Sequence, residues 1–144
     1  MPGKCSFLFT LSVLEKTLVN TCVFGASAVV EDGQGRVLLV RHSYIGGWQL
    51  PGGGVAGGEP PELAVVRELE EEVGLVESTA PEFIALYSRK ILWVGNLIVL
   101  YRLRNARIDF KPNMEVREAK FFDPAALPDG TTGATRRRLA ELFG

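Results

Sequence analysis

The spacing of hydrophobic residues predicts a pair of strands in the first third of the chain. Residues 22–31 and 36–41 are rich in β-branched side chains, which favour strands. The segment 32–35 between them, Asp-Gly-Gln-Gly, supplies residues that tolerate the positive φ of a tight reversal. We therefore expect these two segments to form a β-hairpin.

The middle of the chain carries the pattern of an amphipathic helix. Four apolar residues recur at three- and four-residue steps: Leu63, Val66, Leu69 and Val73. Two prolines, Pro60 and Pro61, stand before this pattern and Gly74 stands after it, as is typical of the two ends of a helix. The pattern predicts a helix over residues 60–73.

The second half of the chain predicts further strands and a closing helix. Apolar and β-branched residues favour three strands, over 82–89, 97–103 and 116–122. The connection 90–96 is expected to be a hairpin loop close to a site. Residues 133–143 predict a helix capped by Thr135 or a residue just before it. Strands that alternate with helices in this order indicate an α/β fold with a mixed sheet whose faces are covered by helices.

Length and composition indicate one ordinary globular domain. The 144 residues, 47% hydrophobic and 23% charged, match a single domain over 1–144. Sixteen Lys and Arg against seventeen Asp and Glu give a formal net charge of −1, which disfavours a nucleic-acid polymer as partner. Two cysteines, Cys5 and Cys22, and one histidine, His42, exclude a disulfide scaffold or a Cys/His zinc site.

The first twenty residues are expected to form an extension packed on the domain, as either a strand or a helix. Residues 5–14 are apolar and follow Lys4, but Glu15 and Lys16 interrupt the run, so it is a poor match to a signal peptide. No stretch reaches the roughly 18 to 20 uninterrupted apolar residues of a membrane-spanning helix. We expect a cytoplasmic protein without a membrane partner; a homodimer stays open.

Three carboxylates share one face of the predicted central helix. At about 100° per residue, Glu71 and Glu72 fall within about 60° of Glu68, nearly opposite the apolar stripe. Like charges at this spacing cost roughly 0.2 to 0.5 kcal/mol per pair, so a compensating positive charge is expected. Oxygen ligands suit a hard divalent cation such as Mg²⁺.

A glycine-rich segment leads into this helix. Residues 42–61 contain seven of the sixteen glycines, which suits backbone that approaches a ligand closely. Its amides could bind phosphate oxygens and a carbonyl could bind the metal. Arg67 precedes Glu68, and its planar guanidinium could orient a carboxylate. These features together indicate chemistry on a metal-bound phosphate.

The stretch from Gly53 to Leu75, GGVAGGEPPELAVVRELEEEVGL, resembles the Nudix box. That motif is Gly, five residues, Glu, seven residues, then Arg-Glu-apolar-any-Glu-Glu-any-Gly-apolar. Every specified position is met, by Gly53, Glu59, Arg67, Glu68, Leu69, Glu71, Glu72, Gly74 and Leu75. The resemblance covers 23 of the 144 residues.

The resemblance implies an α/β/α sandwich that uses Mg²⁺ or Mn²⁺ to hydrolyse a diphosphate linkage. The substrate would be a nucleoside diphosphate bonded to a group X, attacked by water at phosphorus. Carried over by position, the metal ligands would be Glu68, Glu71 and Glu72, with the carbonyl of Gly52 or Gly53. Glu59 and Arg67 would orient the acids, and Glu68 is one candidate for the general base.

Other site residues are expected outside the motif. Glu115 is the first candidate for a general base on a later loop and Glu118 the second, so the expected catalytic set is Arg67, Glu68, Glu72 and Glu115. Residues expected to contact the substrate lie in or beside the glycine-rich segment: Arg41, Trp48, Gly52, Gly53 and Gly54. His42 is expected near the substrate rather than on the metal. The basic run 136–138 is interpreted as an exposed helix face rather than a phosphate contact.

The substrate itself stays open at this point. Nucleoside triphosphates, ADP-ribose and other nucleotide sugars all suit the motif. Two alternatives to a nucleotide hydrolase remain: a module that binds a nucleotide without turnover, and a hydrolase of capped or triphosphorylated RNA ends. The complete set of acids argues against the first, and the net charge argues against the second.

Overall fold

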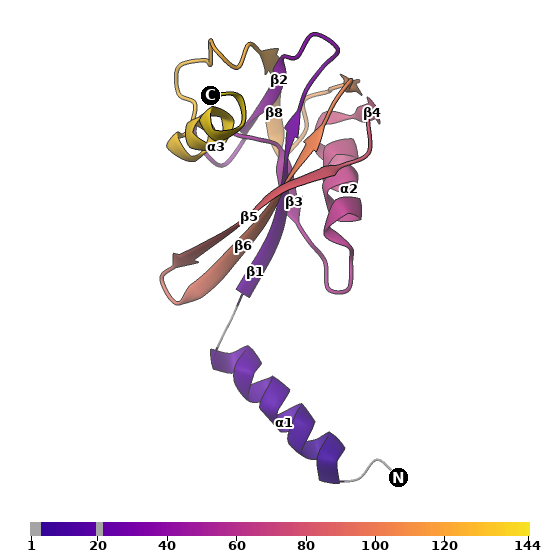
Figure 1. Ribbon diagram of the computed structural model, residues 1–144, viewed down its shortest axis with the longest axis vertical. Helices are drawn as coiled ribbons and strands as arrows, with labels where there is room; N and C mark the ends of the chain where they lie inside the picture. Colours follow the sequence, from indigo (N-terminus) through magenta and orange to yellow (C-terminus); the bar gives the residue numbers. More distant parts are fainter. Residues whose placement is uncertain (1–3, 20–21) are drawn as a thin grey trace.

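The computed structural model describes residues 4–19 and 22–144 (Figure 1). Its three helices are α1 (Lys4–Val19), α2 (Pro61–Val73) and α3 (Gly133–Phe143). Its strands are β1 (Cys22–Val30), β2 (Val37–His42), β3 (Gly52–Gly54), β4 (Leu75–Glu77), β5 (Glu82–Ile91), β6 (Val94–Leu103), β7 (Arg107–Ile108) and β8 (Val116–Phe122). Each helix and strand predicted between residues 60 and 143 is present, while the short strands β3, β4 and β7 were not predicted.

The main sheet is mixed, as expected. Its four strands run in the order β3-β1-β6-β5, and β1 pairs with β6 in parallel while the other pairs are antiparallel. Two smaller sheets pair β2 with β8 and β4 with β7. The expected hairpin loop between β5 and β6 turns at Leu92, which has a positive φ of 56°.

Alternate residues of the strands face two separate hydrophobic clusters. In β2, Leu38 and Val40 pack in the cluster that contains Leu69 of α2, whereas Leu39 packs in the cluster that contains Leu139 of α3. The period-two alternation of strand side chains explains this division. The strands therefore form a layer between α2 and α3, which cover opposite faces (Figure 1).

Local sequence explains where α2 begins and ends. Pro60 is the N-cap, and Gly74 ends the helix in the left-handed conformation with φ of 67° and donates its N–H to the Glu70 carbonyl at 3.2 Å. The apolar face differs by one position from the prediction, because Leu63 is exposed and Val65 is buried instead.

The predicted hairpin between β1 and β2 forms only at its turn. Asp32 accepts hydrogen bonds from the N–H groups of Gln34 and Arg36, both at 2.9 Å, and one residue pair, Glu31 with Val37, bridges the two strands. Beyond that pair, β1 lies between β3 and β6, and β2 pairs with β8. Both edges of β1 are thus occupied, so the expectation of a paired hairpin is wrong.

The N-terminal extension is a helix, α1, which projects from the domain (Figure 1). The expectation that it packs on the domain is wrong for residues 8–15, all of which are exposed, including Phe9 at 71% and Leu8 at 64%. Residues 1–3 and 20 of the predicted extension lie outside the described residues. Among the described helices, none combines the length and apolarity needed to cross a membrane.

Candidate functional site

The acidic face of α2 packs directly against the glycine strand β3. A Cβ atom added to Gly53 would lie 2.3 Å from the Cδ atom of Glu68, whereas one added to Gly54 would meet no atom within 4 Å. A side chain at position 53 would therefore displace the Glu68 carboxylate from its present place. The approach places this carboxylate beside the backbone of β3, as the sequence predicted.

Arg67 holds the acidic side chains in place. Its Nε and Nη2 atoms donate to the two carboxylate oxygens of Glu59 at 2.8 and 2.9 Å, and its Nη1 atom donates to Glu68 at 2.9 Å. Nη2 also donates to the carbonyl of Gly54 at 3.0 Å. One planar guanidinium thus ties the loop before α2 and strand β3 to the helix, as expected for a positioning residue.

The pKa values of two carboxylates bonded to Arg67 shift in opposite directions. The hydrogen bonds from Arg67 and then the Ala56 N–H lower the pKa of Glu59 from 4.5 to about 2. The pKa of Glu68 is instead raised, chiefly because burial disfavours the carboxylate; the Arg67 hydrogen bond opposes this and the charge of Glu72 adds to it. Burial of the Glu68 carboxylate therefore outweighs the hydrogen bond from Arg67.

Glu72 is the most enclosed carboxylate of the site, only 4% exposed. Its Oε2 atom accepts a hydrogen bond from the Gly52 N–H at 3.3 Å, and its Oε1 atom lies 3.7 Å from Nε2 of His42. The other ring nitrogen of His42 is buried and has no hydrogen-bond partner among the described residues. His42 lies at the end of β2 beside Glu72, and its place near the substrate stays a prediction.

Glu71 lies at the rim of the acidic face. Its side chain is 61% exposed and accepts a hydrogen bond from Arg67 at 3.4 Å. Within the described part of the chain, no three His, Cys, Asp or Glu side chains are already arranged as a metal site. The structure brings Glu68 and Glu72 together against β3, and Glu71 stays a predicted ligand.

The loop before β8 is fixed next to the acidic face. Asn113 donates from its side chain to the Glu72 carbonyl at 3.0 Å, and its side-chain oxygen accepts from the N–H groups of Glu115 and Val116. The Glu115 carbonyl accepts a hydrogen bond from the Ser43 N–H at 2.9 Å. Sequence reasoning gave Asn113 no role; the signal was a turn-forming Asn after Pro112, just before a strand.

The charges of Glu115 and of two acids of α2 all act on Tyr44. Burial raises the pKa of Tyr44, and the charges of Glu72, Glu115 and Glu68 raise it further. Tyr44 therefore lies within range of all three carboxylates. The second candidate base, Glu118, is instead paired with Arg41 at 3.3 Å and with Lys120 at 3.4 Å.

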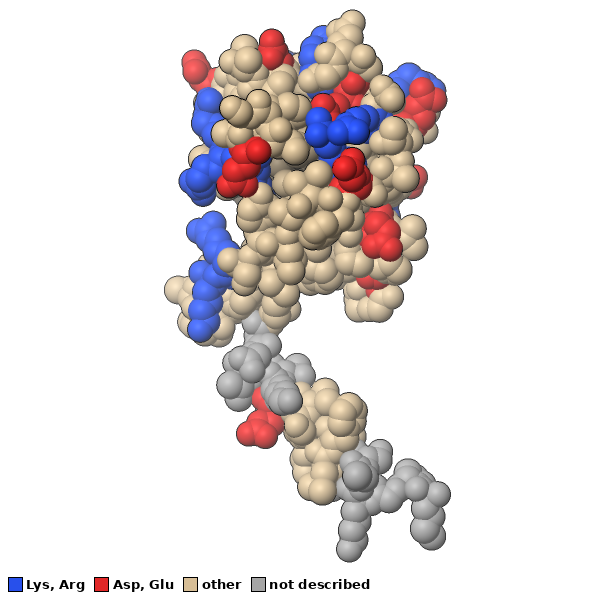
Figure 2. Space-filling model, viewed as in Figure 1, with Lys and Arg blue, Asp and Glu red and all other residues tan. Residues whose placement is uncertain are grey.

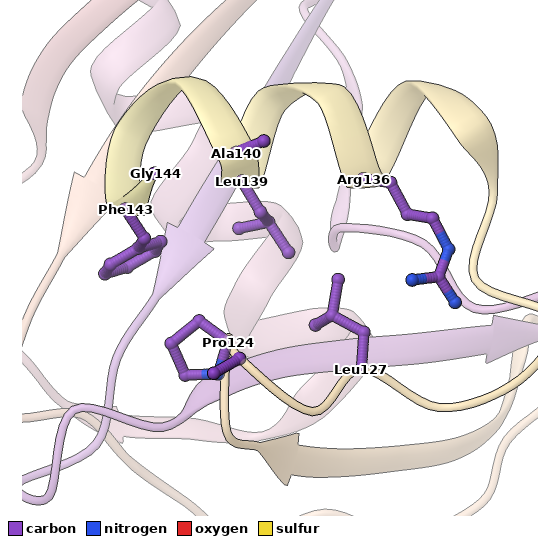
Figure 3. A pocket seen from close by; sticks show the side chains of 8 residues that line it. Pro124, Leu127, Arg136, Leu139, Ala140, Phe143 and Gly144 are labelled. Carbon is purple, nitrogen blue, oxygen red and sulfur yellow. The ribbon is translucent and has the colours of Figure 1, made fainter.

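A cavity of about 530 Å³ opens beside β3, within the range of roughly 300–1,000 Å³ usual for ligand pockets. Its rim near the acids is formed by residues 52–54, His42 and Tyr44, and its floor by β1 and β6. Thr132, Thr135 and Arg138, from the start of α3, form another wall. A second cavity of about 600 Å³, on another side of α3 (Figure 3), shares none of the described lining residues with it.

Two residues expected to bind substrate lie outside the cavity beside β3. Trp48 is buried and packs edge-on against Phe122, with ring centroids 5.0 Å apart. The Arg41 guanidinium lies 5.6 Å from the Trp48 ring and pairs with Glu118. Because side chains alternate along a strand, Arg41 lies on the same face of β2 as Leu39, which packs with Trp48. His42 lies on the opposite face. The structure therefore does not place Arg41 and Trp48 at this cavity, and their contact with substrate stays a prediction.

Comparison with known proteins identifies the family. A family model described as NUDIX domain matches residues 23–143. Among solved structures, a MutT NUDIX hydrolase from Burkholderia pseudomallei superposes with a TM-score of 0.75 at 25% identity, covering 86% of this chain and all of that one. A UDP-X diphosphatase superposes with a TM-score of 0.70 at 20% identity, covering 93% of this chain and 70% of the other, a likeness of fold.

Curated relatives match over a shorter stretch. An RNA pyrophosphohydrolase of Acinetobacter baylyi is 34% identical over 96 residues, which are 65% of this chain and 52% of that protein. One of Shewanella sediminis is 39% identical over 90 residues, or 61% of this chain and 47% of that protein. The chain thus spans about half the length of these curated relatives, or less. The match over residues 23–143, together with the α/β fold with a mixed sheet, shows that the chain belongs to the Nudix hydrolase family.

Proposed function

We propose that this chain is a divalent-metal-dependent pyrophosphohydrolase of nucleotides. It would cleave the diphosphate linkage of a nucleoside diphosphate bonded to a group X by attack of water on phosphorus. The observation that carries the proposal is the packing of the Glu68 and Glu72 carboxylates against β3, whose glycines also line a ligand-sized cavity. Membership of the Nudix family supports the same chemistry.

The donor atoms at β3 suit a hard cation. Glu68 and Glu72 offer carboxylate oxygens, and Gly52 or Gly53 would add a backbone carbonyl, with Glu71 at the rim. The carboxylates of Glu68 and Glu72 both lie against β3, Glu68 beside Gly53 and Glu72 within hydrogen-bond distance of the Gly52 N–H, so one cation at β3 could reach both. Mg²⁺ or Mn²⁺ bound here would neutralise diphosphate charge and lower the pKa of a bound water.

The remaining roles belong to side chains that orient groups and move protons. Arg67 fixes Glu68 through the hydrogen bond at 2.9 Å and fixes the preceding loop through Glu59. Glu115 is our candidate to accept the proton of the attacking water, because its loop is tied to the Glu72 carbonyl through Asn113.

Two classes of substrate are candidates. The first is a small nucleotide, since a cavity of about 530 Å³ suits a molecule of that size. The second is a triphosphorylated RNA end, favoured by the names of the curated relatives and disfavoured by the net charge of −1. An alternative to hydrolysis is a module that binds a nucleotide without turnover.

The test is a panel of nucleoside triphosphates, ADP-ribose, nucleotide sugars and a 5′-triphosphorylated RNA, assayed with Mg²⁺ and with Mn²⁺. We expect metal-dependent hydrolysis of at least one member and its loss in Glu72→Gln. Glu70→Gln is the matched control, because Glu70 is an exposed carboxylate on the same helix. Tight binding of one member without hydrolysis by the unmodified chain would contradict the proposal and favour a binding module.

A further inference from the structure

A group of arginines lies at the end of the cavity opposite the acidic residues. Arg89 is on β5, and Arg137 and Arg138 are on α3. All three line a smaller cavity of about 240 Å³. Arg138 and Ala134 line both this cavity and the one of about 530 Å³ beside β3, so the two hollows share a wall.

The strand register places Arg89 on the same face of the sheet as the cavity floor. Arg89 lies opposite Asn96 of β6, and Asn96 lies opposite Val23 of β1. Both Asn96 and Val23 line the larger cavity. Directly opposed residues of a sheet point to the same face. Lys90, the next residue, points to the other face for the same reason.

The positive charge of this group is largely unpaired. Among the described residues, neither Arg89 nor Arg137 takes part in an ion pair, and neither has a hydrogen bond from its side chain. Arg138 lies with its guanidinium 4.5 Å from the centre of the Tyr87 ring. Glu141 lines the same small cavity, and its carboxylate accepts a hydrogen bond from the Tyr87 hydroxyl at 3.0 Å, so one carboxylate faces the three arginines. In Figure 2 basic side chains gather along the left edge of the domain, over α3 and the end of the β5–β6 hairpin.

The sheet sets the separation between the two ends of the site. From β3 to β5 there are three strand spacings of about 4.8 Å, or about 14 Å in all. The diphosphate of the proposed substrate lies at the β3 end, so its nucleoside covers the floor formed by β1 and β6. The arginine side chains then face the far side of the nucleoside.

We propose that Arg89, Arg137 and Arg138 bind a phosphate that the substrate carries beyond its nucleoside, away from the diphosphate. Arginine is suited to this because its planar donors match phosphate oxygens. The inference rests on the proposed function for the orientation of the ligand. The phosphate is either the terminal 3′-phosphate of a free nucleotide or the first phosphodiester of an RNA 5′ end, since both present the same group at this place.

The test measures binding rather than turnover, so that it is independent of the proposed hydrolysis. The probes are the four ribonucleoside 5′-monophosphates and the corresponding 3′,5′-bisphosphates, titrated by calorimetry into the full chain without metal. We expect at least one bisphosphate to bind about tenfold more tightly than its monophosphate, equivalent to about 1.4 kcal/mol. The difference should largely disappear in Arg89→Gln and in Arg137→Gln.

Two matched variants control for the general loss of positive charge. Lys90→Gln removes a charge next to Arg89 on the opposite face of β5, and Arg136→Gln removes one next to Arg137. Arg136 donates to the Pro128 carbonyl at 3.1 Å and lies beside the apolar cavity on another side of α3 (Figure 3). Both controls should retain the preference for the bisphosphate. Circular dichroism of each variant checks that it folds.

The outcomes are distinct. Equal affinity for each bisphosphate and its monophosphate, including no measurable binding of either, would overturn the inference, as would a preference that survives in the Arg89 and Arg137 variants. The affinity of a 5′-phosphorylated dinucleotide distinguishes a terminal 3′-phosphate from a phosphodiester as the bound group. If it shares the preference, the site accepts the phosphodiester of an RNA end; if only the bisphosphates show it, the site takes a terminal phosphate. Failure of hydrolysis with this preference intact would refute the proposed function alone.

Discussion

Replacing Gly53 with alanine tests how closely the site depends on the contact between β3 and α2. The new Cβ atom would lie 2.3 Å from the Cδ atom of Glu68, and ordinary contacts begin at 3.4 Å. The Glu68 carboxylate must therefore retreat by about 1 Å, or β3 must move by the same amount. A misplacement of about 1 Å can reduce the rate of an enzyme about 100-fold.

We therefore expect kcat of Gly53→Ala to fall about 100-fold in a pyrophosphohydrolase assay at saturating Mg²⁺, with the best substrate of the nucleotide panel. Gly57→Ala is the matched control, because Gly57 is exposed on the loop before α2 and a Cβ atom there meets nothing within 4 Å. It should keep kcat within about threefold of the unmodified chain, a change of about 0.7 kcal/mol in the barrier. A thermal unfolding curve for each variant separates lost activity from lost structure. An active Gly53→Ala, or an equal loss in Gly57→Ala, would refute the argument.

Three further predictions address other parts of the account. Glu115→Gln should lower kcat at least tenfold with little change in KM, whereas Glu118→Gln should leave both unchanged; equal effects in steady-state kinetics would remove Glu115 as the base. Because the pKa of Glu59 falls from 4.5 to about 2 on folding, its ionised form stabilises the folded chain above about pH 4.5, and this contribution is lost as the pH falls toward 2. The free energy of unfolding of Glu59→Gln, measured by urea titration, should therefore depend less on pH across that window than that of the unmodified chain; parallel curves would show that Glu59 has no such role. Trp48→Ala should lower the free energy of unfolding, measured by urea titration, by about 3–5 kcal/mol, as expected for a buried aromatic side chain. A loss below about 1 kcal/mol would contradict the assignment of Trp48 to the core.

The parts of the site that the sequence predicted are those fixed by local geometry. Glu68 and Glu72 lie on one face of α2 because helical residues four apart are neighbours, and Gly74 ends the helix because it adopts a positive φ. The role of Arg67 followed from the motif; its hydrogen bonds to Glu59 and Glu68 are those that a positioning residue would make, and the role itself stays a prediction.

The parts that the sequence did not predict depend on contacts between distant segments. The burial of Glu72 arises where α2 meets β3 and His42, and the position of the 109–115 loop arises from the bond between Asn113 and the Glu72 carbonyl. No spacing along the chain shows which face of β2 will meet α2, so the pattern alone could not place Arg41 away from the cavity. The same holds for β1, whose two edges are occupied by strands from later in the chain.

Binding of Mn²⁺ is the most direct test of the central claim, that carboxylates of α2 and the backbone of β3 hold a divalent cation. The paramagnetic signal of free Mn²⁺ can be followed as the ion is titrated into the unmodified chain, Glu68→Gln, Glu72→Gln and the control Glu70→Gln. We expect saturable binding that Mg²⁺ displaces, weakened at least tenfold by the first two substitutions and unchanged by the third. Binding that is equally strong in all four proteins would contradict the account.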